Sequence, residues 1–245
     1  MQSVYIAMWS GPRNISTALM RSFDSRSDAV VVDEPFYGHY LRESGKAHPM
    51  AQEIMSSMDC DQDNICRRLR ETLPQGKSLS YQKHMAHHLL PSMDRAWMQG
   101  MRHAFLIREP RAMLASLSAK LEVVQLEDTG LPQQVQLFQE LRQGADAVPP
   151  VVDSSDLLAD PGPMLLSLCR GLQIPFSDQM LAWEPGARST DGVWGCHWYG
   201  NTNRSTGFSL APRQASVSLP TELESLAGEC QDLYSQLAEH RLLPN

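Results

Sequence analysis

The sequence lacks the cysteine pattern of a disulfide framework or of a zinc site. Its five cysteines are an odd number in a chain of 245 residues, and no two of them form a C-x-x-C pair. Secreted domains that rely on disulfides are usually smaller and much richer in cysteine. We therefore expect free thiols and a reducing compartment.

Long apolar runs are missing as well. No stretch approaches the roughly 20 apolar residues that span a bilayer. The first apolar run, Val4 to Trp9, is short and Arg13 follows it, so the start of the chain does not look like a signal peptide. These absences predict a cytoplasmic protein without a membrane partner.

Positive charge is also in short supply. Lys and Arg together number 21 against 28 Asp and Glu, which gives a net charge of -7. This balance excludes a broad basic surface, so we expect no nucleic-acid partner, although one isolated anion pocket remains compatible with it. Hydrophobic residues at 42% and charged residues at 20% are near the average for globular proteins, which excludes a disordered chain.

Short apolar runs alternate with segments of helical period, a pattern typical of an α/β fold. It predicts one domain over residues 1–245, with a central, mostly parallel sheet of five strands. Between the second and third strands, at about 38–78, the sequence is polar, rich in Met and compatible with helices, so we expect a helical insertion there. The predicted strands lie at 4–9, 29–32, 79–82, 103–107 and 151–152.

Two strand-to-helix junctions carry the residues of an anion site. Gly11, Arg13, Ser16 and Thr17 follow the first strand, at a place where helix N–H groups converge and favour a negative ligand. The Walker A pattern fails here, because its second glycine and its lysine would fall on Ser16 and Thr17. This mismatch argues against a Walker A site that binds ATP.

The second junction follows the fourth strand. Arg108 stands at the carboxyl end of that strand, where ligands of open α/β sheets bind, and Pro110 suits the first turn of the next helix. Ser116 lies eight residues after Arg108. Either residue alone could be an ordinary surface side chain.

Together the two junctions resemble the P-loop sulfotransferase superfamily, which uses 3′-phosphoadenosine 5′-phosphosulfate (PAPS) as co-substrate. Its first motif is matched by P-R-N-I-S-T at 12–17, and its R-x-P with a later serine by Arg108, Pro110 and Ser116. The segments W-S-G-P-R-N-I-S-T, D-E-P-F-Y and S-T-G-F resemble those of a bacterial branch, also found as the N-terminal part of plant proteins labelled branched-chain aminotransferase-like.

The resemblance implies a three-layer P-loop-type fold, an acceptor pocket roofed by the insertion at 38–78, and a late segment, 192–208, that closes over PAPS. Two departures concern the loop, since Ile15 replaces the family's glycine and Asn14 its serine. The residues expected to bind PAPS are Gly11, Pro12, Arg13, Asn14, Ile15, Ser16, Thr17, Arg108, Ser116, Arg204 and Ser205.

For catalysis the resemblance implies electrostatic roles for Arg13 and Lys83, and a general base that is either Glu34 or His84. Glu34 occupies the place of a carboxylate base in other bacterial members, whereas His84 has the right titration range. The histidines at 84, 87 and 88 lack an H-E-x-x-H glutamate or a cysteine partner, so we expect no metal.

We thus expect a sulfotransferase that moves a sulfuryl group from PAPS to a hydroxyl or amine of a soluble small molecule. The sequence also leaves open whether the protein forms a homodimer. Two alternatives stay open too. Asp33 and Glu34 after an apolar strand imitate a Walker B site, which would suit a magnesium-dependent P-loop kinase or NTPase. A catalytically silent nucleotide-binding module would keep the anion loops without the base.

Overall fold

The computed structural model describes residues 3–143, 148–209 and 218–244. Five strands form a single sheet in the order β2-β3-β1-β4-β5, and every neighbouring pair is parallel. The α/β class and all five predicted strands are confirmed. The strands are β1 (Val4–Ser10), β2 (Ala29–Asp33), β3 (Leu79–Met85), β4 (Arg102–Ile107) and β5 (Val151–Asp153).

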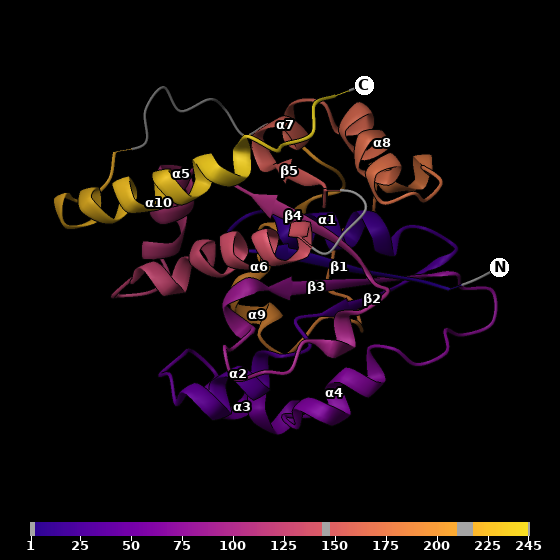
Figure 1. Cartoon of the computed structure of the whole chain (residues 1–245), viewed down its shortest axis with the longest axis horizontal. Coiled ribbons are helices and arrows are strands. Elements are labelled where there is room, and N and C mark those ends of the chain that lie inside the picture. Colours follow the sequence, from indigo (N-terminus) through magenta and orange to yellow (C-terminus); the bar gives the residue numbers. More distant parts are fainter. Residues whose placement is uncertain (1–2, 144–147, 210–217, 245) are drawn as a thin grey trace.

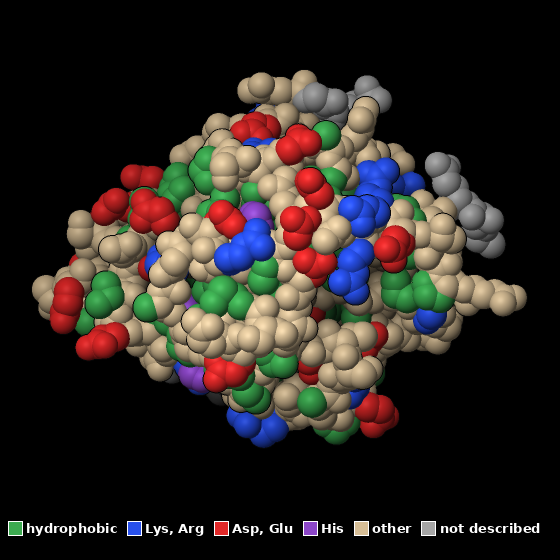
Figure 2. Space-filling view, turned by 90° about the horizontal axis from the view of Figure 1, so that it is seen from below, with side chains coloured by type: hydrophobic (Ala, Val, Ile, Leu, Met, Phe, Trp, Pro, Cys, Tyr) green, Lys and Arg blue, Asp and Glu red, His purple; other side chains and the backbone are tan. Residues whose placement is uncertain are grey.

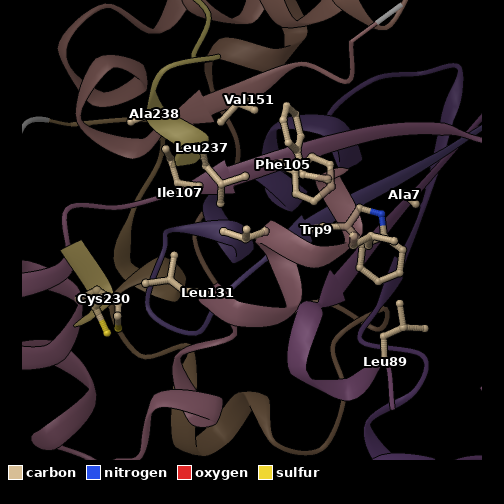
Figure 3. Packing of buried hydrophobic residues seen from close by; sticks show 14 of the residues in the cluster. Ala7, Trp9, Leu89, Phe105, Ile107, Leu131, Val151, Cys230, Leu237 and Ala238 are labelled. Atoms are coloured by element: carbon tan, nitrogen blue, oxygen red, sulfur yellow. The ribbon is translucent and has the colours of Figure 1, made fainter. Parts of the chain in front are cut away.

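Both faces of the sheet are covered, which explains why a strand such as β1 is an apolar run instead of an alternating one. Successive side chains of a strand point to opposite faces. In β1, Ile6 and Met8 therefore join one buried cluster, while Ala7 and Trp9 join another. Figure 3 shows the second cluster, where Trp9 and Phe105 of the sheet lie among residues of the covering helices.

The helices form the two outer layers (Figure 1). On one face α6 packs along β1, and α10 packs against α5 and α6. On the other face α1 packs on β2 and β3, and α7 contacts α8. These helices are α1 (Ser16–Asp24), α5 (Pro110–Ser118), α6 (Leu131–Gln143), α7 (Ser154–Ala159), α8 (Pro161–Gly171) and α10 (Glu224–Ala238).

The insertion between β2 and β3 is helical. Its helices are α2 (Tyr37–Ser44), α3 (Ala51–Ser57) and α4 (Gln62–Arg68), which lie below the sheet in Figure 1. A third buried cluster joins α2 and α3 to Trp194 and Tyr199, around the short helix α9 (Gly195–Trp198). The late segment of the chain therefore packs against the insertion.

Among the described residues, no helix is both long and apolar enough to cross a membrane. Figure 2 shows one face of the molecule, on which acidic and basic side chains lie next to one another. The face in that view therefore carries charges of both signs and is not a broad basic surface.

Candidate functional site

The loop between β1 and α1 leaves the first turn of the helix open. Ile15 is the N-cap residue of α1, and its apolar side chain offers no oxygen to cap the first N–H groups. Ser16 and Thr17 form the first helical positions and are nearly buried. Unsatisfied N–H groups, two hydroxyls and the positive end of the helix dipole therefore converge at this point, as an anion site requires.

Ile15, which stands in place of the family's loop glycine, adopts a backbone conformation that glycine favours. Ile15 has φ 59° and ψ 17°, in the left-handed region, and Arg13 has φ 63°. Glycine occupies this region at no cost, whereas a β-branched residue is strained there. Asn14 donates from Nδ2 to the Leu106 carbonyl at 3.2 Å and so ties the loop to β4. Ile15 thus keeps a glycine-like path under strain.

The two arginines of the motifs lie together. Arg108 Nη1 donates to the Arg13 carbonyl at 2.5 Å, and Arg13 Nε donates to Ser116 Oγ at 2.9 Å. Burial lowers the pKa of both guanidinium groups, but an arginine with an ordinary pKa above 12 stays charged. No ion pair among the described residues includes Arg13 or Arg108. Two neighbouring cations without a carboxylate partner form a site that suits an anion.

A second group of charges lies where β2 and β3 end. Lys83 Nζ donates to Glu34 Oε1 at 2.6 Å, to Tyr199 Oη at 2.7 Å and to Asp33 Oδ1 at 2.8 Å. An ammonium group has three N–H donors, so every one of them has an acceptor. Asp33 and Lys83 pair with their strands in register, which brings the side chains to the same edge of the sheet.

Glu34 differs from the other members of this group. Its side chain is 9% exposed, against 1% for Asp33 and Lys83. Burial raises its pKa above the ordinary value, and the charge of Asp33 raises it further, although Lys83 opposes both effects. Its backbone has φ 42°, a left-handed conformation that costs free energy in a residue other than glycine. Strain at a partly shielded carboxyl with a raised pKa is typical of a general base.

One cavity of about 510 Å³ joins these features. Most predicted site residues line it: Pro12, Arg13, Asn14, Ile15, Ser16, Thr17, Glu34, Lys83, Arg108, Ser116 and Ser205. Its wall also includes residues from the insertion and from the segment 198–209. The structure therefore brings together the two motifs, the insertion and the late segment.

Three predicted residues do not line the cavity. Gly11 begins the loop and packs against the Thr129 backbone, where an added Cβ would come within 2.1 Å of the Thr129 carbonyl oxygen. Arg204 donates to Asn201 Oδ1 at the surface. The buried His84 stacks on Trp9 at 4.5 Å between ring centroids.

Burial of His84 lowers its pKa to about 3, so the ring is neutral at ordinary pH. The period of a strand explains its placement, because His84 directly follows Lys83 and adjacent side chains point to opposite faces. Of the two candidate bases, Glu34 is therefore the one that faces the cavity.

Several cavity residues were not expected from the sequence. Tyr199 bonds Lys83, and Trp198 receives a bond from Arg13 Nη1 on its carbonyl at 3.5 Å. The insertion contributes an aromatic wall, in which His88 of the segment after β3 stacks between Tyr37 and Tyr40. These contacts join distant parts of the chain, and their only signal in the sequence is the aromatic richness of the late segment.

Asp33 has no carboxylate oxygen left for a magnesium ion of the Walker B kind. Asp33 Oδ1 accepts from Lys83, and Oδ2 accepts from the Gly192 N–H at 3.2 Å and from Tyr199 Oη at 2.8 Å. Both carboxylate oxygens of Asp33 are thus occupied by protein donors. Among the described residues, no group of three or more His, Cys, Asp or Glu side chains is arranged to hold a metal ion.

Comparison with known proteins adds to this geometry. Residues 4–220 match a family model described as "Sulfotransferase domain". Two relatives from Arabidopsis thaliana, branched-chain-amino-acid aminotransferase-like proteins 2 and 1, are each 34% identical over 235 residues, which is 96% of this chain. The match covers 41% and 42% of those relatives, so the chain spans about two fifths of their length.

Solved structures share the fold at low identity. The sulfotransferase domain of the Synechococcus PCC 7002 olefin synthase matches with a TM-score of 0.59 at 16% identity, over 96% of each chain. The sulfotransferase domain from the curacin biosynthetic pathway matches with a TM-score of 0.60 at 18% identity, over 100% of this chain and 99% of the other. At such identities the likeness concerns the fold alone.

Proposed function

The chain belongs to the sulfotransferase domain family, and from that premise we propose that it transfers a sulfuryl group from PAPS to a hydroxyl or amine of a small molecule. One observation carries the proposal. A single cavity holds two arginines without carboxylate partners at one part of its wall and the Glu34-Lys83 pair at another. The negative charge of an anionic nucleotide would pair with the two arginines, and the Glu34-Lys83 pair suits proton transfer.

The residues present fit PAPS as a co-substrate. Arg108, Arg13 and Ser116 form one connected set of donors, which suits a phosphate group with several acceptor oxygens. The open first turn of α1, with Ser16 and Thr17, suits a second anionic group. When bound, PAPS supplies the sulfuryl group as an activated phosphosulfate, with 3′,5′-ADP as the leaving group.

In the proposed reaction, the acceptor oxygen or nitrogen forms a bond to sulfur while the bond from sulfur to the phosphate oxygen breaks. Glu34 takes the proton that the acceptor loses, and later returns it to solvent. Lys83 places a positive charge in a shielded site, where charge interactions are stronger than in water. Burial and Asp33 keep the pKa of Glu34 above its ordinary value, which strengthens this carboxylate as a base.

Thermal shift measurements test the donor half of the proposal. A ligand at 100 times its dissociation constant adds about 2.7 kcal/mol, which for a chain of this size is a rise of about 5–11 °C in Tm. We expect 3′,5′-ADP to give this rise and ATP with magnesium to give none. Arg108→Ala should abolish it, whereas Arg42→Ala, at an exposed arginine outside the cavity, should leave it intact.

Stabilisation by ATP with magnesium alone would instead favour the kinase or NTPase alternative. The catalytic half is tested by turnover of PAPS with a panel of alcohols, phenols and amines. Glu34→Gln should remove turnover and leave the 3′,5′-ADP shift unchanged. If 3′,5′-ADP binds but no acceptor is sulfated, the silent module is the better description.

A further inference from the structure

The Lys83 ammonium lies in a buried polar network that extends well beyond the base. Tyr199 Oη donates its single proton to Asp33, with Oδ2 at 2.8 Å and Oδ1 at 2.9 Å. Trp194 Nε1 donates to the same Oη at 2.8 Å. The phenol thus accepts from Lys83 and Trp194 and donates to Asp33, which fills its hydrogen-bonding capacity.

The two carboxylates around Lys83 are not equivalent. Glu34 lines the cavity, whereas Asp33 lies behind it and is absent from the described cavity wall. Asp33 has protein donors on both oxygens, while the bond that fixes the Glu34 carboxyl is the one from Lys83 to Oε1. Tyr199 Oη also lies 3.4 Å from Glu34 Oε1, a weaker contact than its bond of 2.8 Å to Asp33 Oδ2.

We propose that Asp33 and Tyr199 are positioning residues, which hold two of the three Lys83 N–H groups and thereby leave Glu34 as the carboxylate that exchanges a proton with the acceptor. Neither would need to touch the reacting atoms. Asp33 balances the lysine charge, so that Lys83 stays protonated whether Glu34 is ionised or not. This inference rests on the proposed function for its role in turnover, although its effect on Glu34 can be measured without any substrate.

The charged and titratable groups around Glu34 come from each element packed against it. Those groups are Asp33 of β2, Lys83 of β3, Tyr37 of α2 and Tyr199 after α9. The charge of Asp33 raises the pKa of Glu34, and the bond from Tyr199 lowers it. Asp33→Asn and Tyr199→Phe should therefore move the titration of Glu34 in opposite directions.

The first measurement compares the pH dependence of the free energy of unfolding for matched pairs, each variant with and without Glu34→Gln. The pKa of Glu34 is higher in the folded protein than its ordinary value near 4.5, so the stability that its protonation contributes is present below that value and lost as pH rises through the folded pKa. Relative to the wild-type pair, this loss should end at lower pH in Asp33→Asn and at higher pH in Tyr199→Phe.

Tyr81→Phe is the control. Tyr81 is a fully buried tyrosine of the same strand as Lys83, and its Oη has no hydrogen-bond partner among the described residues. It should leave the titration window of Glu34 in place. If Asp33→Asn does not fold, the shift of the Glu34 titration to higher pH in Tyr199→Phe still tests the proposal. If the pH range in which Glu34 titrates is unchanged in every folded variant, the proposal is overturned.

The second measurement is the hydrolysis of PAPS, in which water is the acceptor and the release of inorganic sulfate is measured. Here a water oxygen bonds to sulfur, the bond from sulfur to phosphate breaks, and Glu34 takes a water proton. Tyr199→Phe should lower kcat about 10- to 100-fold, as loss of precise positioning does, with the KM for PAPS unchanged. The acid limb of the pH profile of kcat for Tyr199→Phe should move to higher pH.

A kcat for Tyr199→Phe within about twofold of Tyr81→Phe would also overturn the positioning role, provided that the wild type turns PAPS over. If 3′,5′-ADP fails to bind the wild type while the titration window still moves as expected, the proposed function fails and the control of Glu34 by Asp33 and Tyr199 stands. The two failures are thus distinguishable.

Discussion

The buried ion pair between Arg21 of α1 and Asp191, the residue before the late segment, offers the sharpest stability prediction. Arg21 Nη1 and Nη2 donate to the two carboxylate oxygens of Asp191 at 2.6 and 2.7 Å, and Nη2 also lies 3.3 Å from Asn203 Oδ1. The side chains are 1% and 7% exposed. Asp191→Ala would leave the Arg21 charge buried without its carboxylate, which is a far larger cost than loss of a surface pair.

Removal of one partner of a buried pair costs about 3–5 kcal/mol. A change of 1 kcal/mol moves the Tm of a chain of this size by about 2–4 °C, so we expect Asp191→Ala to lower Tm by about 6–20 °C. Urea unfolding followed by circular dichroism measures the free energy directly. The double variant Arg21→Met/Asp191→Leu should recover much of the loss, because no uncompensated charge then remains.

The exposed pair between Arg111 and Glu224 is the matched control, since it has the same bidentate geometry at the surface. Glu224→Gln should leave the urea midpoint nearly unchanged. A loss below about 1 kcal/mol in Asp191→Ala, or a double variant no more stable than the single one, would show that the burial of the pair does not have the energetic consequence argued from the structure.

Three further predictions concern the loop and the second candidate base. Gly11→Ala should cost about 1–3 kcal/mol in urea unfolding, because its Cβ would meet the Thr129 carbonyl, while Gly162→Ala has open space and should be tolerated. Ile15→Gly should be more stable than Ile15→Ala by about 1–2 kcal/mol, since only glycine is relaxed at φ 59°. His84, with a pKa lowered from 6.5 to about 3, contributes stability that is lost as pH falls below 6.5, so His84→Gln should flatten this loss without moving the acid limb of PAPS turnover.

The sheet could be predicted from the sequence because its strands are buried on both faces. Runs such as Val4 to Trp9 are apolar throughout, and such runs indicate a strand between two helical layers. The motifs that carry the family resemblance were also readable, since the loop at 12–17 and the pair Arg108 and Ser116 are local in the sequence. The family and the fold follow from these features, and both are confirmed.

The catalytic half was only partly readable. Local residues pointed equally to Glu34 and His84, although the two-residue period of a strand already implies that Lys83 and His84 face opposite ways. Tyr199 could not be found, because it reaches Lys83 across 116 positions of sequence and no local pattern records that contact. The assignment of Glu34 over His84 therefore stays a prediction that the pH experiments must decide.

The late segment connects the two halves of the candidate site, and this connection explains why neither half is complete on its own. Asp191, the residue before this segment, is held to α1, which begins at the loop of residues 12–17, while the segment's own contacts reach that loop and Lys83 beside Glu34. A disturbance of this segment should thus weaken donor binding and displace the base together. The contacts are Arg21 to Asp191, Arg13 to Trp198, Asp33 to Gly192 and Lys83 to Tyr199.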